Sequence, residues 1–330
     1  MNSNESQHPY SRLNPDTVIA AIESLGLIAD LRILALNSYE NRVYQMGIED
    51  SQPIIAKFYR PERWSDAQIL EEHVWCAELK EHELPVVPPL ILQARSLHEY
   101  DGFRFAIFPR QGGHAPPLDN LDNLLIIGRC LGRIHALGAT QPFEHRINLN
   151  TKNFGEASVD YLLTHDFIPQ HLREAYETLT RDILLQVNQI FSDVSNYKNI
   201  RLHGDCHPGN ILWRDEQAHF VDFDDALMGP AIQDLWMLLS GDRTEQTQQL
   251  SEILEGYREF HDFNLRELRL IESLRTLRML NYSAWLAKRW TDPAFPHNFP
   301  WFNTSRYWEE QVLALREQQF ALTENTLEIL

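Results

Sequence analysis

Cysteine, long apolar runs and basic charge are all scarce in this chain of 330 residues. The three cysteines, Cys76, Cys130 and Cys206, are odd in number and follow no disulfide or metal-binding spacing, which predicts a reduced, cytoplasmic protein. No apolar run approaches the roughly 20 residues that a membrane span requires, and the polar start MNSNESQHPYS is unlike a signal peptide. With 29 basic and 47 acidic residues, the net charge of −18 disfavours a broad surface for nucleic acid or anionic membrane.

Apolar residues make up 43% of the chain and aromatic residues 11%, enough for one large domain or for two lobes with a cleft between them. Hydrophobic periodicity and turn residues predict strands in the first third and mainly helices after it. The expected helices span residues 15–25, 66–83, 120–137, 170–191, 245–261, 265–289 and 305–319, and one more begins near Gly229. The expected strands span residues 32–36, 42–46, 54–59, 88–94, 103–108, 199–202, 211–213 and 219–221. An abrupt change of composition at 109–113 predicts a hinge between an N-terminal lobe, 1–110, and a C-terminal lobe, 111–330.

The densest set of reactive side chains lies in RLHGDCHPGNILWRD, at 201–215, and in the following AHFVDFDDA. Short strands flank a polar loop there, so that Asp205, Asn210 and Asp222 are expected at neighbouring strand ends. Phosphoryl transfer needs such a set, because one carboxylate orients the acceptor hydroxyl while an amide and a second carboxylate hold Mg²⁺ on the phosphates.

Other interpretations of the same loop stay open. It is also compatible with a polar turn that happens to carry ionisable residues. A zinc site of His203, Cys206 and His207 would lack the second ligand cluster that structural zinc sites use. Protonated histidines on both sides would favour a thiolate at Cys206, which suggests an oxidation-sensitive switch beside Asp205. The simpler alternative is that a small residue is tolerated at this position.

The order and spacing of these side chains resemble the aminoglycoside phosphotransferase and choline kinase branch of the protein kinase fold. Asp205 and Asn210 are separated as in the kinase loop H-R-D-x-x-x-x-N, and Asp222 corresponds to the Asp of D-F-G, although this chain reads Asp-Phe-Asp. The resemblance implies an α+β, bilobal protein-kinase-like fold, with a small N-terminal antiparallel-sheet lobe and a larger, mainly helical C-terminal lobe. It also implies Asp205 and Asp222 as catalytic residues, Asn210 and Asp222 as Mg²⁺ ligands, and ATP as the donor.

The residues expected to bind the nucleotide match the kinase pattern less completely. Lys57, in IIAKFY, resembles the lysine of V-A-I-K that binds the α- and β-phosphates, and its apolar neighbours mean that its charge needs a partner. Glu71 and Glu72 on the following helix are both candidates, and counting back from the expected end of that helix favours Glu72. A Gly-rich loop is absent. In its place NSYEN, at 37–41, offers the hydroxyl and N–H of Ser38 to a phosphate, or is an ordinary hairpin turn.

Two features nearer the C-terminus each have a functional and a structural interpretation. Asp234 resembles the family aspartate that holds the catalytic loop by hydrogen bonds, but a carboxylate in a first helical turn also interacts favourably with the helix dipole. The aromatic side chains between Tyr282 and Trp308 could enclose a quaternary ammonium such as choline. Because aromatic residues bury large apolar areas, core packing is the favoured interpretation.

Further stretches narrow the resemblance to the bacterial stress response kinases, a family of eukaryotic-like Ser/Thr protein kinases within this branch. They are residues 36–44, 57–64, 201–215, 229–239 and 289–296. The resemblance implies phosphorylation of Ser and Thr in proteins, including the enzyme itself, by a cytoplasmic monomer that uses ATP and Mg²⁺ and binds neither nucleic acid nor membrane. A kinase for an amino-alcohol or aminoglycoside stays open, as does a nucleotide-sensing pseudokinase, which the intact reactive residues disfavour.

Overall fold

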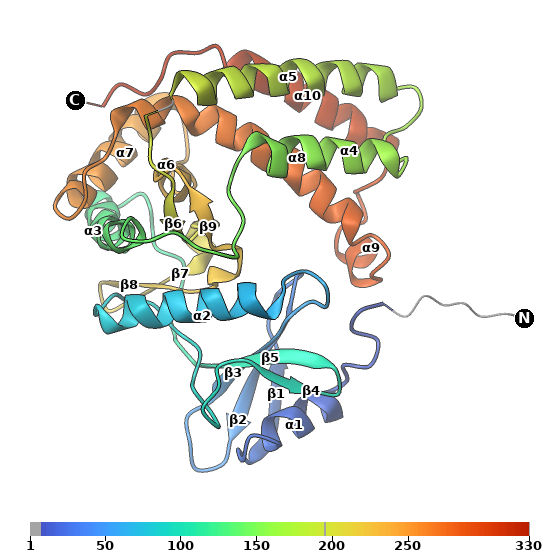
Figure 1. Ribbon diagram of the computed structural model, residues 1–330, viewed down its shortest axis with the longest axis vertical. Coiled ribbons are helices and arrows are strands. Elements are labelled where there is room, and N and C mark those ends of the chain that lie inside the picture. Colours follow the sequence, from blue (N-terminus) through green and yellow to red (C-terminus); the bar gives the residue numbers. More distant parts are fainter. Residues whose placement is uncertain (1–7, 195, 330) are drawn as a thin grey trace, which may run out of the picture. The chain divides into compact units, whose positions relative to one another are not determined.

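The structure, a computed structural model, describes residues 8–194 and 196–329 and divides into two compact units. The first, here called the sheet unit, consists of the described residues up to Pro116 together with Gly209–Asp224. The second, here called the helical unit, consists of Pro117–Pro208 and the described residues from Asp225 onward (Figure 1). The chain therefore enters the sheet unit and leaves it again within the stretch that carries the predicted catalytic side chains.

The sheet unit is built on a five-stranded antiparallel sheet (Figure 1). Across the sheet, the strands follow the order β1 (Ala29–Ala35), β2 (Arg42–Ile48), β3 (Ile54–Phe58), β5 (Phe103–Pro109) and β4 (His98–Tyr100). The predicted strands at 32–36, 42–46, 54–59 and 103–108 overlap with observed ones. β3 lies at the centre, so side chains on it are flanked by neighbours on both sides.

Helices α1 (Pro15–Glu23) and α2 (Asp66–Glu81) pack on opposite faces of this sheet. α1 shares a core with Phe105, whereas Ile69 of α2 packs against Ala106. Successive side chains of a strand point to opposite faces, which is why neighbouring residues of β5 meet different helices. The face beneath α2 is the one that carries the predicted nucleotide-binding lysine.

The strand predicted at 88–94 is wrong. Pro88 and Pro89 have no backbone N–H to donate to a ladder, and Gln93 and Ala94 adopt left-handed backbone conformations that turn the chain. Only the N–H of Leu90 reaches β5, where it donates to Ile107 O. The strand that completes the sheet instead begins after this turn, as β4.

A hairpin of β7 (Ile211–Arg214) and β8 (Gln217–Phe220) completes the sheet unit. Isolated bridges join Phe220 of β8 to Val86 and Trp213 of β7 to His114. These bridges explain why a segment from the second half of the sequence belongs to a unit formed mainly by the first.

The helical unit contains eight described α-helices and a two-stranded antiparallel sheet of β6 (Ile200–Leu202) and β9 (Leu227–Gly229). The helices are α3 (Leu121–Gly138), α4 (Ala157–Thr164), α5 (Arg173–Asp193), α6 (Ile232–Trp236), α7 (Arg243–Arg258), α8 (Ile271–Lys288), α9 (Ala294–Asn298) and α10 (Ser305–Ala321). Strand β9 and helices α4 and α9 were not predicted. A 3₁₀ helix, Leu265–Leu270, forms the first part of what the sequence predicts as one helix from 265 to 289.

Helices α3 and α7 approach each other closely because glycines line their contact. A Cβ atom on Gly128 would lie 2.1 Å from the carbonyl oxygen of Ile253, and one on Gly132 would lie 2.4 Å from that of Tyr257. Any side chain at either position would therefore push the two helices apart. The pair is connected to the catalytic loop through His135 of α3, whose Nδ1 lies 3.0 Å from the hydroxyl of Tyr257 and whose Nε2 lies 3.1 Å from Asp234.

Most of the aromatic side chains between Tyr282 and Trp308 are packed in the helical core, as predicted. Phe295, Phe299, Phe302 and Trp308 are buried in a cluster with α4, α5, α8 and α10, and the Trp308 ring lies edge-on to that of Tyr176 on α5. Tyr282 and Trp301 are exceptions, with 43% and 44% of their surface exposed. In the part of the chain that the structure describes, none of the helices is long and apolar enough to cross a membrane.

Candidate active site

The β7–β8 hairpin places two of the predicted side chains at one end of the sheet unit. Ile211, the first residue of β7, pairs with Phe220, the last residue of β8. One step beyond, the N–H of Val221 donates to the carbonyl oxygen of Asn210 over 3.0 Å. Asn210 and Asp222 therefore lie at the same end of the hairpin, as the strand–loop–strand pattern predicts. Asp222 has a left-handed backbone, with φ 60°, and its side chain is 54% exposed.

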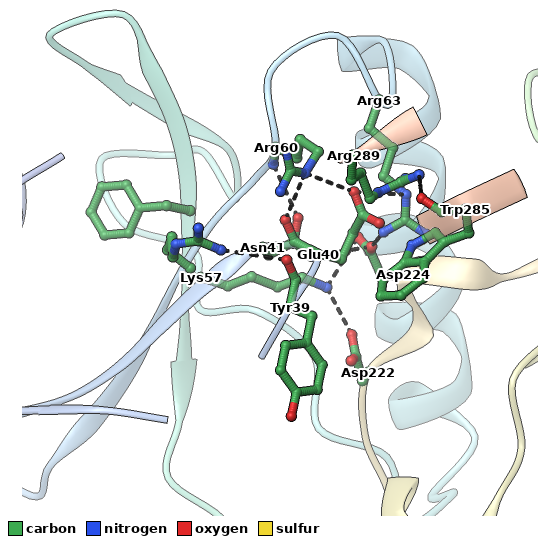
Figure 2. Close-up of polar contacts among 12 residues, drawn as sticks. Tyr39, Glu40, Asn41, Lys57, Arg60, Arg63, Asp222, Asp224, Trp285 and Arg289 are labelled. Atoms are coloured by element: carbon green, nitrogen blue, oxygen red, sulfur yellow. Dashed lines mark hydrogen bonds and ion pairs between the residues drawn. The ribbon is translucent and has the colours of Figure 1, made fainter. Parts of the chain in front are cut away.

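Lys57 is buried in the middle of the sheet among carboxylates (Figure 2). It pairs in register with Ala106, so its side chain extends on the face covered by α2. Its Nζ lies 3.0 Å from Asp222 Oδ1, 3.1 Å from Asp224 Oδ1 and 3.8 Å from Glu72 Oε1. Of the two glutamates considered from sequence, Glu72 is the one that pairs with Lys57, because it is on the buried face of α2.

Lys57 stays positively charged although its side chain is buried. Burial acts to lower the pKa of an ammonium group, but the carboxylates of Asp222, Asp224 and Glu72 together raise the pKa of Lys57 well above its ordinary value. The lysine is therefore cationic over the whole physiological range. The ammonium group can form charge-assisted hydrogen bonds with phosphate oxygens, whereas the exposed carboxylate beside it would repel phosphate unless a divalent cation lay between them.

Asp224, just after the hairpin, pairs with two basic residues of the sheet unit, Lys57 and Arg63 (Figure 2). Besides Lys57, its carboxylate accepts a hydrogen bond from Arg63 and one from Asn41 Nδ2, the latter over 3.1 Å. Asn41 Oδ1 in turn accepts from the backbone N–H of Arg60 over 3.0 Å. The turn between β1 and β2 is thus tied to the residues after β3 and to the segment that contains Asp222.

The turn between β1 and β2 contains Ser38, which the sequence resemblance assigns to phosphate binding. Glu40 lies 3.1 Å from Arg60 Nε and 3.8 Å from Arg63 Nε, measured from its Oε1 atom. Ser38 lies in the same turn and is half-buried. The turn is therefore fixed by charged side chains rather than left loose, as a glycine-rich segment would be.

In the helical unit, Asp234 holds the loop that precedes Asp205. Its Oδ2 accepts from the backbone N–H of His203 and its Oδ1 from that of Gly204, each over 2.8 Å, and the carboxylate is fully buried. His135 Nε2 lies 3.1 Å from Asp234 Oδ2. The loop-holding role predicted for Asp234 is confirmed, whereas a helix dipole alone would not explain two backbone hydrogen bonds to another segment.

Gly204 allows the loop to turn directly after His203. Its φ is +86°, a conformation that L side chains rarely adopt, and a Cβ there would lie 2.1 Å from the carbonyl oxygen of Asp225. The side chain of Gln233 also reaches this point and donates from Nε2 to Gly204 O over 3.0 Å. Sterics and hydrogen bonds together fix the backbone one residue before Asp205.

The Asp205 carboxylate is partly exposed and is paired with a cation from another element. Arg278 Nη1, on α8, lies 2.7 Å from Asp205 Oδ1, and His207 Nε2 lies 3.5 Å from Asp205 Oδ2. Burial acts to raise the pKa of this carboxyl, but Arg278 first and His207 second lower it, so that the pKa is below its ordinary value. Asp205 is therefore an ionised carboxylate at neutral pH.

Comparison with known proteins shows the family to which the chain belongs. A family model described as the phosphotransferase enzyme family matches residues 32–271. Over 326 residues the chain is 44% identical to Stress response kinase A of Escherichia coli O157:H7. The alignment covers 99% of this chain and 98% of that protein. A Salmonella typhimurium protein named Serine/threonine protein kinase RdoA is 43% identical with the same coverage. The chain belongs to the stress response kinase A family.

Membership of this family makes the chain a phosphotransferase enzyme, and the predicted family resemblance is confirmed. Solved kinase structures are also similar to it. Amicoumacin kinase hAmiN in complex with AMP-PNP, Ca²⁺ and Ami has a TM-score of 0.72 and 18% identity, covering 93% of this chain and 94% of that one. Spectinomycin phosphotransferase APH(9)-Ia has a TM-score of 0.65 and 14% identity, with coverage of 93% and 98%. These structures confirm the α+β kinase-like fold.

Zinc and Mg²⁺ need different kinds of site in a protein. In residues 8–194 and 196–329, no group of three or more His, Cys, Asp or Glu side chains could hold a metal ion on its own. The zinc interpretation of the catalytic loop therefore has no support. Mg²⁺ is bound through one or two carboxylates together with waters and substrate phosphates, so it needs no closed protein cage. The amide of Asn210 and the exposed carboxylate of Asp222 fit that requirement.

The hypothesis of a thiolate at Cys206 is wrong in its premise. The side chain is completely buried, and burial raises the pKa of the Cys206 thiol well above its ordinary value, with the carboxylates of Asp234 and Asp205 adding to the effect. The neighbouring histidines do not reverse this. Cys206 is a small, buried residue within the catalytic loop, which agrees with the simpler of the two alternatives.

Two charged residues of the site were missed by sequence reasoning. Asp224 replaces the glycine of the D-F-G pattern, and its position after an apolar strand was the available signal that a further buried carboxylate would meet Lys57. Arg278 gave no local signal, because its contact with Asp205 joins positions 73 residues apart in the sequence.

A buried glutamate supports the helix that carries Asp234, and its protonation predicts a pH-dependent stability. Glu267 Oε2 accepts from the backbone N–H of Ile232 at the start of α6 over 3.1 Å, and burial raises the pKa of Glu267 from 4.5 to about 7. The folded state therefore keeps this proton longer than the unfolded state. Stability contributed by the neutral carboxyl is present below pH 4.5 and is lost as the pH rises through about 7.

Glu267→Gln removes this titration, so the stability of the variant relative to the unmodified protein is expected to increase between pH 5 and pH 8. At about 1.36 kcal/mol per pKa unit, the increase is at most about 3 kcal/mol. Denaturation of both proteins by urea at several pH values measures it. A stability difference that stays constant with pH would contradict the assignment.

Proposed function

We propose that this protein transfers the γ-phosphoryl group of ATP, with Mg²⁺, to Ser and Thr hydroxyls of proteins, including its own. The observation that carries the proposal is the 43% identity, along 99% of the chain, with a protein named Serine/threonine protein kinase RdoA. The reaction is proposed to occur in the cytoplasm, where ATP is available. Cys76, Cys130 and Cys206 are all free, in keeping with such a reducing compartment.

In this proposal the sheet unit binds the nucleotide. Lys57 binds the α- and β-phosphates, and Glu72 keeps the ammonium group in place beneath α2. Ser38 donates to a phosphate from the turn between β1 and β2. Asn210 and Asp222 would hold Mg²⁺, which would supply positive charge to the phosphates. The Lys57–Asp222 ion pair of 3.0 Å supports the proposal, because an ammonium group that binds phosphates and a carboxylate that holds Mg²⁺ on them have to be neighbours.

Asp205 orients the acceptor. Its carboxylate is ionised, is partly exposed and is attached to a loop fixed by Asp234, so it can accept a hydrogen bond from a Ser or Thr hydroxyl and take its proton during transfer. The proton leaves the hydroxyl as its oxygen bonds to the γ-phosphorus, and the bond to the leaving ADP oxygen breaks. Asp222, the second predicted catalytic residue, would contribute by holding Mg²⁺ and does not contact the acceptor hydroxyl in this proposal.

The charge around Asp205 favours a protein hydroxyl over a cationic alcohol. Arg278, 48% exposed at its side chain, is 2.7 Å from Asp205 and offsets the negative charge of this carboxylate. A pocket selective for choline, an amino-alcohol or an aminoglycoside needs net negative charge or aromatic faces around the ammonium group. The aromatic residues between Tyr282 and Trp308 are instead mostly buried in the helical core.

The experiment is a comparison of acceptors with the pure full-length protein. ADP formation from ATP and Mg²⁺ is measured with a mixture of dephosphorylated proteins, and separately with choline, ethanolamine, homoserine and kanamycin. We expect saturable ADP formation with proteins and only background with the small alcohols. The reverse result would make the small-molecule alternative the function, and background with every acceptor would support the pseudokinase.

A further inference from the structure

Arg278 of α8 is the side chain that most directly faces the proposed acceptor-orienting carboxylate. Its Nη1 atom lies 2.7 Å from Asp205 Oδ1, a distance typical of charge-assisted hydrogen bonds. Met237, just after α6, lies against the same guanidinium, with its Sδ 3.9 Å from Nη1. The arginine therefore reaches Asp205 from α8, an 18-residue helix of the helical unit.

The two oxygens of Asp205 are in different environments. Oδ1 is bound to Arg278, whereas Oδ2 lies 3.5 Å from His207 Nε2, beyond normal hydrogen-bond distance. The contact with Arg278 at Oδ1 restricts rotation of the carboxylate group. The backbone of Asp205 is fixed independently, since the two preceding N–H groups donate to Asp234.

We propose that Arg278 is a positioning residue for phosphoryl transfer, which holds the Asp205 carboxylate through Oδ1 in the orientation that receives the hydroxyl of the acceptor. This rests on the proposed function, in which Asp205 orients that hydroxyl. A second consequence is electrostatic. The titratable and charged groups that act on Asp205 are Arg278 from α8 and His207 and His203 from its own loop, and Cys206 beside it is buried and neutral. Arg278 is the only permanent cation among them.

Arg275 provides a matched control on the same helix. It lies one turn before Arg278 and has a similar exposed fraction, 34% against 48% for the side chains. Its guanidinium pairs with Glu272 at 3.1 Å and lies over the Trp236 ring, 5.0 Å from the centroid. Replacing it removes the same charge from the same surface without changing a direct contact of Asp205.

The test compares Arg278→Gln, Arg278→Lys and Arg275→Gln in the full-length protein with a protein acceptor. Since general base catalysis contributes roughly 10²–10⁴ in rate, loss of the positioning contact is expected to lower kcat about 10- to 100-fold in Arg278→Gln. KM for ATP should stay unchanged, and Arg278→Lys should recover part of kcat. The acid limb of the kcat–pH profile should move to higher pH, because Asp205 loses the cation that keeps it ionised.

Arg275→Gln is expected to match the unmodified protein in kcat and in the pH profile. The inference is overturned if Arg278→Gln has the kcat and pH profile of Arg275→Gln while Asp205→Asn is inactive. If Asp205→Asn is itself fully active, the proposed role of Asp205 has failed instead. Melting temperatures of the variants identify a folding defect, which would lower the activity of Arg278→Gln and Arg278→Lys alike and leave the pH profile in place.

Discussion

Asp205→Asn is expected to lower the rate of phosphoryl transfer by roughly 10²–10⁴-fold, the usual contribution of a positioned general base. The amide has the same shape and can still accept from Arg278, but it is uncharged and cannot take the acceptor proton. The affinity for Mg²⁺–ATP should be unchanged, because Lys57, Asn210 and Asp222 are untouched. Single-turnover transfer to a protein acceptor measures the loss, and titration calorimetry measures nucleotide affinity.

Asp166→Asn is a suitable control for that experiment. Asp166 is also in the helical unit and forms an ion pair, with Arg173 at 3.1 Å, but its side chain is 88% exposed. The same chemical change there should leave transfer intact. Near-normal transfer by Asp205→Asn would show that this carboxylate is only a turn residue. Weakened nucleotide binding would show that Asp205 acts on the nucleotide rather than on the acceptor.

Asp222→Asn is expected to weaken the binding of Mg²⁺ and to slow phosphoryl transfer. The carboxylate is the proposed anionic ligand of Mg²⁺ and is 3.0 Å from Lys57, so Asp222→Asn would remove a metal ligand and a partner of a buried cation together. We expect the half-saturating Mg²⁺ concentration to rise by at least tenfold and kcat to fall on the order of 10²–10³-fold, as when one electrostatic stabiliser is removed.

The matched change is Asp215→Asn, at the turn of the same hairpin, where the side chain is 84% exposed and pairs with Arg214. It should leave the metal dependence unchanged. Titration of initial rates with Mg²⁺ at saturating ATP, for both variants, decides between a metal ligand and a merely structural residue. Equal half-saturating concentrations in the two variants would argue against metal binding by Asp222.

Local sequence patterns could predict the elements that carry the site. The apolar strand around Lys57 and the strand–loop–strand around Asn210 are formed by residues close in the sequence, and α2 begins at a capping box of Ser65 and Gln68. Glu72 lies three residues after Ile69 on the buried face of that helix, so its pairing with Lys57 follows from helical spacing.

What the sequence could not predict depends on long-range packing. Strand β9 has three residues and exists because it pairs with β6, from Ile200↔Gly229 to Leu202↔Leu227. The apolar residues of 88–94 resemble a strand, but Pro88 and Pro89 lack the backbone N–H groups that a strand must donate, and this overrides the preference. For Cys206, the neighbours in sequence suggested a reactive thiol, whereas burial by the rest of the helical unit determines its pKa.

The central claim is that an ionised Asp205 directs the γ-phosphoryl group of ATP to protein hydroxyls. The most direct test is incubation of the full-length protein with labelled ATP, Mg²⁺ and protein acceptors, followed by acid hydrolysis and phosphoamino-acid analysis, with Asp205→Asn in parallel. The prediction is phosphoserine and phosphothreonine in the acceptors and in the enzyme itself, and neither with Asp205→Asn. Label found only in a small alcohol, or protein-bound label that persists undiminished in Asp205→Asn, would contradict it.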